Sequence, residues 1–282
     1  MLYVARRRVA EEPVSKLAIW SRRLALFAIA VVLLVIVIVN LGFLDPLPAI
    51  ASLAGSLFFA LVAMVLAFGA FVVIWRQGLR GLGLAVAALG VGVAMLAYPA
   101  YLGVLLYRLP AVNDISTDPI DPPRFEAIAR LRPRGANPIA YPGAAATQLQ
   151  RAAYPDIEPL LVSVPPLEAY DAALAVITKR KWRIVDLRPP QTGRREGRIE
   201  AVARTPIMGF RDDIVVRVRS AEDGARIDMR SASRYGKHDF GANASRLRSL
   251  SNDIDDLAGA EKAKPKPPPK PAPKKGAQPA KR

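Results

Sequence analysis

Three long apolar runs fill most of residues 24–107, and no other feature constrains the fold as strongly. The runs span residues 24–44, 47–75 and 79–107. Only Asp45, Arg76 and Arg80 are charged within residues 24–107. Each run exceeds the roughly 20 apolar residues that cross the hydrocarbon core of a bilayer. We therefore predict an α-helical membrane anchor of three transmembrane helices, preceded by a basic segment at residues 1–23.

The charges that flank the apolar runs predict how the anchor is oriented. Six basic residues precede the first run: Arg6, Arg7, Arg8, Lys16, Arg22 and Arg23. Arg76 and Arg80 occupy the second turn, whereas the first turn carries only Asp45. Because short basic segments stay in the cytoplasm, we expect a multi-pass protein of the inner (cytoplasmic) membrane. Its N-terminus is expected in the cytoplasm, and its C-terminal domain in the periplasm of a bacterial cell.

The apolar runs contain few residues that could transfer protons or bind ions. No charged residue lies in their interiors, and intramembrane charges are what mark proton relays and ion paths. The first run ends in NLGFLDP, without the small-residue motif at which a signal peptide is cleaved. We therefore expect a retained helix, and an anchor that is integral to the lipid bilayer.

Charge is distributed unevenly along the chain. The net charge is +16, but residues 109–260 contain 23 basic and 20 acidic residues, which is close to balance. A nucleic-acid-binding domain concentrates basic charge on one folded face, so we expect no nucleic-acid partner.

The absence of cysteine excludes disulfides, thiol nucleophiles and cysteine metal sites. Residues 261–282 are rich in Lys and Pro and are predicted to form a disordered tail.

Residues 108–165 are rich in Pro, Asp and Ala. They are predicted to form an extended lead-in with turns, because proline fixes its own φ and restricts the preceding residue. Asp114, Asp118 and Asp121 suggest a cation site, but their spacing matches no EF-hand loop, and Asp-Pro pairs are common in turns. We predict neither a metal site nor a cofactor.

Residues 166–260 have the periodicities of a folded α+β domain. PLEAYDAALAVITKRK predicts a helix, and WRIVDLR, GRIEAVAR, DDIVVRVRS and ARIDMRS predict strands. A last helix carries Leu247, Leu250 and Ile254 on its apolar face. This order predicts an antiparallel sheet of about four strands with helices on one face. Four charged residues are expected to share its outer face: Arg217, Arg219, Asp228 and Arg230.

The stretch RSASRYGKHDFGAN, residues 230–243, joins the last strand to the last helix and contains the only histidine. One hypothesis for it is structural, with Asp239 capping the helix and Gly241 admitting another backbone at close range. A buried amide must be hydrogen-bonded, so Asn243 is expected to bond to the backbone of the preceding loop. Arg230 and Ser231 belong to the same structural motif.

Two functional hypotheses compete with the structural one. A helix N-terminus attracts anions, and Arg234, Lys237 and His238 crowd this one, so the loop is a candidate anion-binding site. The alternative is a periplasmic hydrolase that uses Ser231 or Ser233 as nucleophile with His238 as base. Triads are recognised by geometry, and no nucleophile elbow is present in the sequence.

Four segments in order resemble the motifs of domain of unknown function 1499 (DUF1499). They are DISTDPIDPPRF, YPDIEPL, GFRDDIVVRVR and DMRSASRYGKHDFGANASRLRSL, and the resemblance covers about residues 113–257. The matching motif residues are Asp114, Ser116, Thr117, Asp118, Phe210, Asp212, Asp213, Arg230, Ser231, Ser233, Arg234, Gly236, Asp239, Gly241, Asn243 and Arg246. The membrane-anchored arrangement is similar to bacterial members. The resemblance implies no established activity, substrate or cofactor.

These features predict a non-catalytic module of the cell envelope that binds an anionic ligand or a partner protein. The expected partners are the lipid bilayer, and either an anionic envelope polymer or another membrane protein. A hydrolase is the alternative function.

Overall fold

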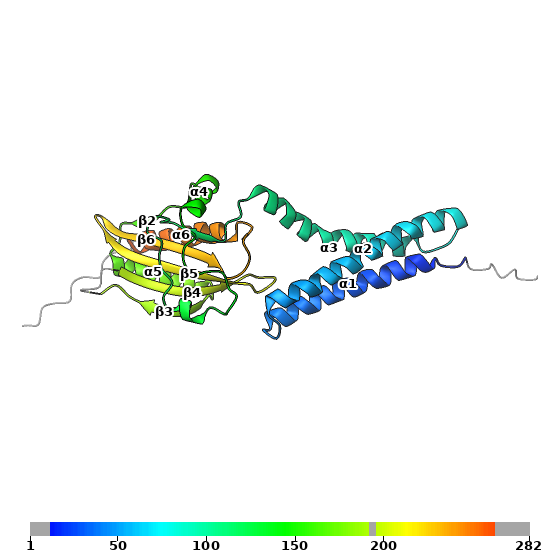
Figure 1. The fold of residues 1–282 in the computed structure, drawn as a ribbon, viewed down its shortest axis with the longest axis horizontal. Helices are drawn as coiled ribbons and strands as arrows, with labels where there is room; N and C mark the ends of the chain where they lie inside the picture. Colours follow the sequence, from blue (N-terminus) through cyan, green and yellow to red (C-terminus); the bar gives the residue numbers. More distant parts are fainter. Residues whose placement is uncertain (1–11, 192–195, 263–282) are drawn as a thin grey trace, which may run out of the picture.

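The structure is a computed structural model that describes residues 12–191 and 196–262. The first part of the basic N-terminal segment and the predicted disordered tail, from residue 263 onward, lie outside the described residues. Three long helices come first: α1 (Lys16–Asn40), α2 (Pro46–Gln77) and α3 (Leu82–Arg108). Each is long and apolar enough to cross a membrane, in agreement with the three apolar runs (Figure 1).

The first helix begins earlier than the apolar run that predicts it. α1 starts at Lys16, so Arg22 and Arg23 lie within the helix instead of in a separate flank. The chain before α1 is tied to the turn between α2 and α3, because the N–H of Ser15 donates to the O of Arg80 at 2.9 Å. The basic residues at this end of the three helices are therefore held together by backbone structure.

The three helices pack through small side chains. Their common buried cluster consists of Ala18, Ala25, Ala63, Ala67, Ala70, Ala85 and Ala88. Small residues let helices approach closely in a bilayer, where apolar burial does not drive helix association. The buried residues of α3 end at Gly92, and Pro99 lies in its second half. Figure 1 shows this second half leaving the other two helices.

An antiparallel sheet forms the centre of the domain that follows. Its strands are β1 (Asp114–Ser116), β2 (Leu160–Val162), β3 (Arg183–Arg188), β4 (Glu196–Arg204), β5 (Arg211–Ala221) and β6 (Gly224–Ser233). The order is β1-β6-β5-β4-β3, and β2 also pairs with β6. The sheet thus has six strands, and the prediction of four was wrong. β1 and β2 have three residues each, too few for an alternating pattern to identify them.

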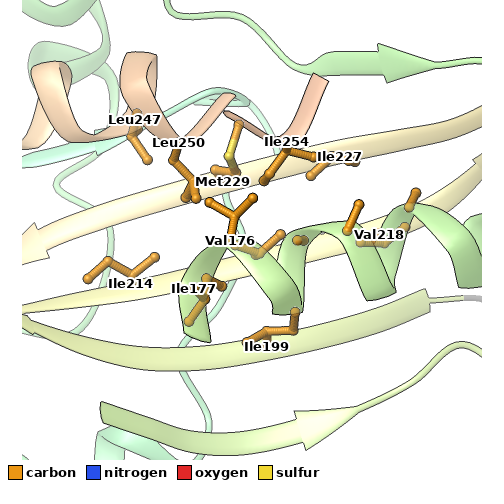
Figure 2. Close-up of a cluster of buried hydrophobic side chains, with 14 of the residues drawn as sticks. Val176, Ile177, Ile199, Ile214, Val218, Ile227, Met229, Leu247, Leu250 and Ile254 are labelled. Atoms are coloured by element: carbon orange, nitrogen blue, oxygen red, sulfur yellow. The ribbon is translucent and has the colours of Figure 1, made fainter. Parts of the chain in front are cut away.

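Two helices cover one face of the sheet, α5 (Pro166–Lys179) and α6 (Ala242–Lys262). Val176 of α5 and Leu250 of α6 belong to one buried cluster with apolar side chains of the strands, including Ile214 and Ile227 (Figure 2). Both isoleucines are fully buried. Removing this apolar surface from water is the main driving force for folding the domain.

Irregular chain covers the opposite face of the sheet. Residues 117–143 contain the short 3-10 helix η1 (Ile128–Leu131), and α4 (Ala144–Ala153) follows. Phe125 and Ile128 of this covering segment pack against Val202 and Val215 of the sheet. The segment predicted as an extended lead-in is thus a third layer of the domain, and it also carries β1 and β2.

The charged residues of this face share one side of the sheet, as their alternation predicts, but they are not a solvated outer face. Asp228 is 0% exposed and Arg230 is 2% exposed. Arg217 is also buried and pairs with Asp228 at 3.0 Å. The covering segment removes these three residues from water and leaves Arg219 partly exposed, which the sequence pattern of the strands alone does not reveal.

Candidate functional site

The stretch of residues 230–243 connects β6 to α6 and contains three residues at positive φ, of which Phe240 and Gly241 directly precede α6. Phe240 has φ 55° and Gly241 has φ 79°, so α6 begins only after them. The carboxylate of Asp239 accepts the N–H of Gly241 at 2.9 Å and that of Asn243 at 2.8 Å. These bonds satisfy donors that a helix start leaves unpaired. The positive φ explains the glycine, whereas the sequence suggested the close passage of another backbone.

Asn243 is fully buried, and both polar atoms of its amide are hydrogen-bonded. Nδ2 donates to the backbone O of Asn113 at 3.0 Å and to Ser233 Oγ at 2.9 Å. Oδ1 accepts Ser231 Oγ at 2.7 Å and Nη1 of Arg246. The amide therefore joins α6 to β6 and to the chain before β1. Its partners differ from the loop backbone that the sequence suggested.

Two other amides hold the loop that follows β6. Nδ2 of Asn113 donates to the O of Gly236 at 2.6 Å. Nδ2 of Asn137 donates to the O of Ser233 at 2.9 Å and to the O of Gly236 at 2.8 Å. The backbone N–H of Asn137 donates to the O of Arg234 at 2.7 Å. Sequence reasoning missed both asparagines, because they stand among prolines without a periodic pattern.

Arg230 fastens the covering segment to β6. Its Nε and Nη2 donate to the two carboxylate oxygens of Asp114 at 2.9 and 2.6 Å. Nη1 donates to the O of Pro123 at 3.2 Å, and Nη2 also donates to the O of Ile139 at 2.9 Å. The ring of Phe125 lies 4.7 Å from the guanidinium carbon. A planar guanidinium is suited to this bidentate and stacked environment, so Arg230 has a structural role in the described chain.

Arg234, a predicted anion ligand, is buried and already paired. Its Nε and Nη2 lie 2.9 and 2.7 Å from Oδ1 of Asp213. The other oxygen of Asp213 accepts Nε of Arg132 at 2.7 Å. One fully buried carboxylate thus binds two guanidinium groups, and Arg234 has a counter-ion without any added ligand.

The other two predicted anion ligands lie at the surface of the same loop. Lys237 is exposed and forms no ion pair within the described residues. His238 accepts the N–H of Phe240 at Nδ1, 2.9 Å away. Its Nε2 therefore carries the proton and donates to the O of Leu109 at 3.0 Å. Both ring nitrogens bond to backbone, so His238 ties the loop to the residue directly after α3.

The two serines of the hydrolase hypothesis lie away from these histidine bonds. Ser231 Oγ donates to Asn243 and accepts Nη1 of Arg246 at 2.8 Å. Ser233 Oγ accepts Nδ2 of Asn243. A nucleophile needs an adjacent base within hydrogen-bond reach, and the described hydrogen bonds of His238 join it to backbone atoms and to neither serine.

Burial shifts the pKa of two carboxyls in this region upward. Desolvation raises the pKa of Asp114, and the hydrogen bonds and charge of Arg230 partly offset that rise. Desolvation likewise raises the pKa of Asp239, against the N–H bonds from Asn243 and Gly241. A raised pKa means that keeping the group ionised inside the fold costs stability at neutral pH. The hydrogen-bond partners of these two carboxyls thus offset only part of the cost of burying them.

Where the domain meets the helices, the structure brings a loop of the sheet together with α1 and α2 (Figure 1). The sequence did not indicate this contact. The loop between β4 and β5, residues 205–210, lies against the end of α1. Nδ2 of Asn40 donates to the O of Ile207 at 3.1 Å. Met208 packs against a buried cluster of α1 and α2 that includes Val39 and Ala49. A six-residue loop without periodicity gives no sign of this contact.

Two arginines flank this loop at the ends of its strands. Arg204 and Arg211 stand directly opposite each other in the pairing of β4 with β5, and both are exposed. Neither forms an ion pair in the part of the chain that the structure describes. Arg211 also lines a cavity of about 130 Å³, together with Asp45 and Tyr235. Like charges directly opposite on a sheet repel, so this pair favours an anion between or beside them.

Among residues 12–191 and 196–262, no three His, Asp or Glu side chains lie together as a group that could hold a metal ion.

Comparison with known families gives a match to the family described as protein of unknown function (DUF1499), over residues 114–254. The resemblance seen in the motifs is thereby confirmed. The match begins at β1 and ends in α6, so it leaves out the three long helices. No curated protein and no solved structure matches the chain.

Proposed function

The chain belongs to the DUF1499 family, and we propose that it is a non-catalytic module of the cell envelope that binds an anionic ligand. The observation that carries this proposal is that polar residues of the motifs are used inside the domain. Arg230, Asp239 and Asn243 are buried and bond to other parts of the same fold. Side chains engaged in this way support a rigid domain, and a substrate does not reach them.

We place the domain on the periplasmic side of the cytoplasmic membrane. Arg22 and Arg23 lie on the first turns of α1, and Arg76 and Arg80 lie near the turn between α2 and α3. The turn between α1 and α2 carries Asp45. Basic residues remain on the cytoplasmic side. The domain contacts the end of α1 that lies away from these basic residues, which supports its placement outside.

The end of the domain that faces the helices is the surface best suited to an anion. Arg211 and Lys237 are exposed at this end and have no carboxylate partner among the described ion pairs. The loop of Lys237 is held beside the end of α3 by the bond from His238 to Leu109. Arg234 lines the cavity next to Arg211, but it is buried and already paired with Asp213. We assign ligand attraction to the exposed cations and loop geometry to Arg234 and His238.

A reporter fusion tests the placement. An alkaline phosphatase fused after Leu257 is expected to be active, because that enzyme requires export, and a fluorescent protein that folds only in the cytoplasm is expected to be dark there. The reverse pattern contradicts the periplasmic placement. Fusions at Gly78, in the turn between α2 and α3, serve as the matched control and are expected to give the opposite signals.

Binding of labelled polyphosphate to the full-length chain in detergent tests the anion preference. We expect weaker binding in the Arg211→Gln/Lys237→Gln variant and a steep loss with added salt, since exposed charges are screened. The Arg130→Gln/Arg151→Gln variant removes two exposed arginines elsewhere on the domain and is expected to bind as the natural chain does. Equal binding by both variants contradicts the proposed surface.

A further inference from the structure

We propose that the junction between the helices and the domain binds one anionic phospholipid of the membrane. Its phosphate lies on Arg204 and Arg211, and an acyl chain lies in the groove between α1, α2 and α3. This inference rests on the proposed function, because it names the anionic ligand, and it adds an apolar site that the proposed function does not include.

An apolar groove lies between the three helices where α3 departs from α1 and α2. Its volume is about 370 Å³, and its lining includes Val32, Leu53, Ala94, Tyr98, Ile207 and Met208. All of these side chains are apolar except the hydroxyl of Tyr98. Volumes of roughly 300–1,000 Å³ are typical of sites for small molecules. A groove of this composition at membrane depth is filled by hydrocarbon.

The two ends of the groove differ in what bounds them. On the domain side, Ile207 and Met208 of the β4–β5 loop line it. On the other side, the buried contacts of α3, which end at Gly92, bring the helices together. The opening between the helices faces the bilayer, so a lipid chain enters from the side and needs no passage through the protein.

Positive charge without a counter-ion lies directly beside the apolar loop. The other arginines that β5 and β6 place on this face each have a carboxylate partner: Arg217, Arg219 and Arg226 pair with Asp228, and Arg230 pairs with Asp114. Arg204 and Arg211 have no such partner in the described ranges, although they face each other across the strands. A phosphate removes this repulsion, and each guanidinium can hold two of its oxygens.

The depth of the arginines matches that of a headgroup. Nη2 of Arg204 donates to the O of Val39 at 3.4 Å, beside the last residue of α1. An arginine at the end of a membrane helix lies where phosphates of the bilayer lie. Arg211 lines the cavity at the start of α2, so both guanidinium groups lie at the same boundary.

The hairpin loop fixes the distance between the charged part and the apolar part of the site. The N–H of Thr205 donates to the O of Phe210 at 2.8 Å, and the N–H of Gly209 donates to the O of Thr205 at 3.0 Å. Gly209 has φ 61°. The loop is thus built by its own bonds before any ligand binds, and it presents two arginines and two apolar side chains to one amphipathic molecule.

Native mass spectrometry of the full-length chain in detergent tests the charged half of the site. With phosphatidylglycerol and phosphatidylcholine added in equal amounts, we expect one retained phosphatidylglycerol. In Arg204→Gln/Arg211→Gln we expect its retention to fall about tenfold, because each arginine near an anionic lipid contributes a several-fold gain. The Arg130→Gln/Arg151→Gln variant is expected to retain it fully. Equal retention of the two lipids by the natural chain, or full retention in Arg204→Gln/Arg211→Gln, overturns the proposal.

A groove variant tests the apolar half and separates this inference from the proposed function. Ala94→Trp fills the groove and is expected to abolish lipid retention while polyphosphate binding is unchanged. Ala97→Trp adds the same side chain at an exposed position outside the groove lining and is expected to have no effect. Unchanged lipid retention in Ala94→Trp overturns the inference and leaves the anion surface standing. A dimer that Ala94→Trp dissociates assigns the groove to a second copy, and it overturns the inference too.

Discussion

The two faces of the domain's sheet are both buried, but by opposite means. The face under α5 and α6 is lined by side chains such as Ile214, Ile227 and Met229, each fully buried. The face under residues 117–143 has a small apolar cluster around Val215 but is otherwise lined by Arg217, Asp228 and other charged groups that pair with one another. Helices with an apolar stripe cover the first face, and irregular chain covers the second.

The difference between the faces follows from what covers each of them. A helix satisfies its own backbone hydrogen bonds and needs only an apolar surface beneath it. Irregular chain has unpaired carbonyl and N–H groups, which must find partners when buried. Arg230 supplies donors to the O of Pro123 and of Ile139, and buried Glu200 accepts N–H groups at the start of η1. Charged side chains on the sheet thus supply the hydrogen-bond partners that the backbone of the covering segment needs, whereas a helix finds such partners within its own backbone.

The largest expected effect comes from breaking the charged face at Arg230. Arg230→Met leaves the carboxylate of Asp114 buried without a partner, and removing one member of a buried pair costs about 3–5 kcal/mol. The free energy of unfolding is measured from amide hydrogen exchange of β6 in the full-length chain in detergent. The control is Arg230→Met/Asp114→Asn, which removes both charges and is expected to recover part of the loss. A cost below about 1 kcal/mol for Arg230→Met refutes the view that charge holds this face together.

An intermediate effect is expected at Asn243, a polar residue on the apolar face. Asn243→Leu and Asn243→Ala both remove the hydrogen bonds that the amide makes to Ser231, Ser233 and the O of Asn113. Each variant is expected to lose roughly 1–3 kcal/mol of stability, the cost of unpaired buried polar groups, in the same exchange measurement on β6 and α6. If Asn243→Leu is as stable as the natural chain, apolar packing alone suffices on this face and the contrast between the faces sharpens.

The smallest expected effect concerns an exposed ion pair. Arg248 hydrogen-bonds to Asp156 at 2.8 Å and lowers the pKa of that carboxyl below its ordinary value of 3.8. Because the folded pKa is the lower one, the pair contributes stability above pH 3.8 and loses it as the pH falls through the folded value. The contribution of such an exposed pair is at most about 1 kcal/mol.

Unfolding midpoints at pH 6 and pH 3 test this ion pair. Asp156→Asn is expected to lose slightly less stability on acidification than the natural chain. The matched control is Asp255→Asn, an exposed acid on α6 with no ion pair in the described chain, which is expected to match the natural chain. A larger acid loss in Asp156→Asn than in the natural chain contradicts the direction of the pKa shift.

Sequence patterns predicted those elements whose side chains repeat with a fixed period. The three apolar helices, the long strands and α6 were found in this way, because Leu247, Leu250 and Ile254 recur on one side of a helix. β1 and β2 were not predicted, since a strand of three residues contains no repeat. The packing of residues 117–143 on the sheet was not predicted either, because the hydrogen bonds that hold this segment come from Arg230 and Glu200, which are far away along the chain.

The candidate site was predicted less well than the fold. The crowding of Arg234, Lys237 and His238 in one loop suggested a common ligand, yet the structure turns Arg234 inward onto Asp213. A sequence does not tell which arginines have carboxylates opposite them, since that depends on strand register and on the covering segment. Arg204 and Arg211 became visible as a pair only through the register of β4 with β5.

The bond between Arg230 and Asp114 also has a consequence in time. The two residues are 116 positions apart, so the ribosome has released Asp114 well before Arg230 exists. At a synthesis rate of about 5–20 residues per second, that interval is roughly 6–23 s. During it, residues 117–143 have no β6 to lie on, and their aspartates and arginines keep the waiting segment polar. The composition that hides this segment from secondary-structure patterns is the composition that keeps it soluble until its partner strand is made.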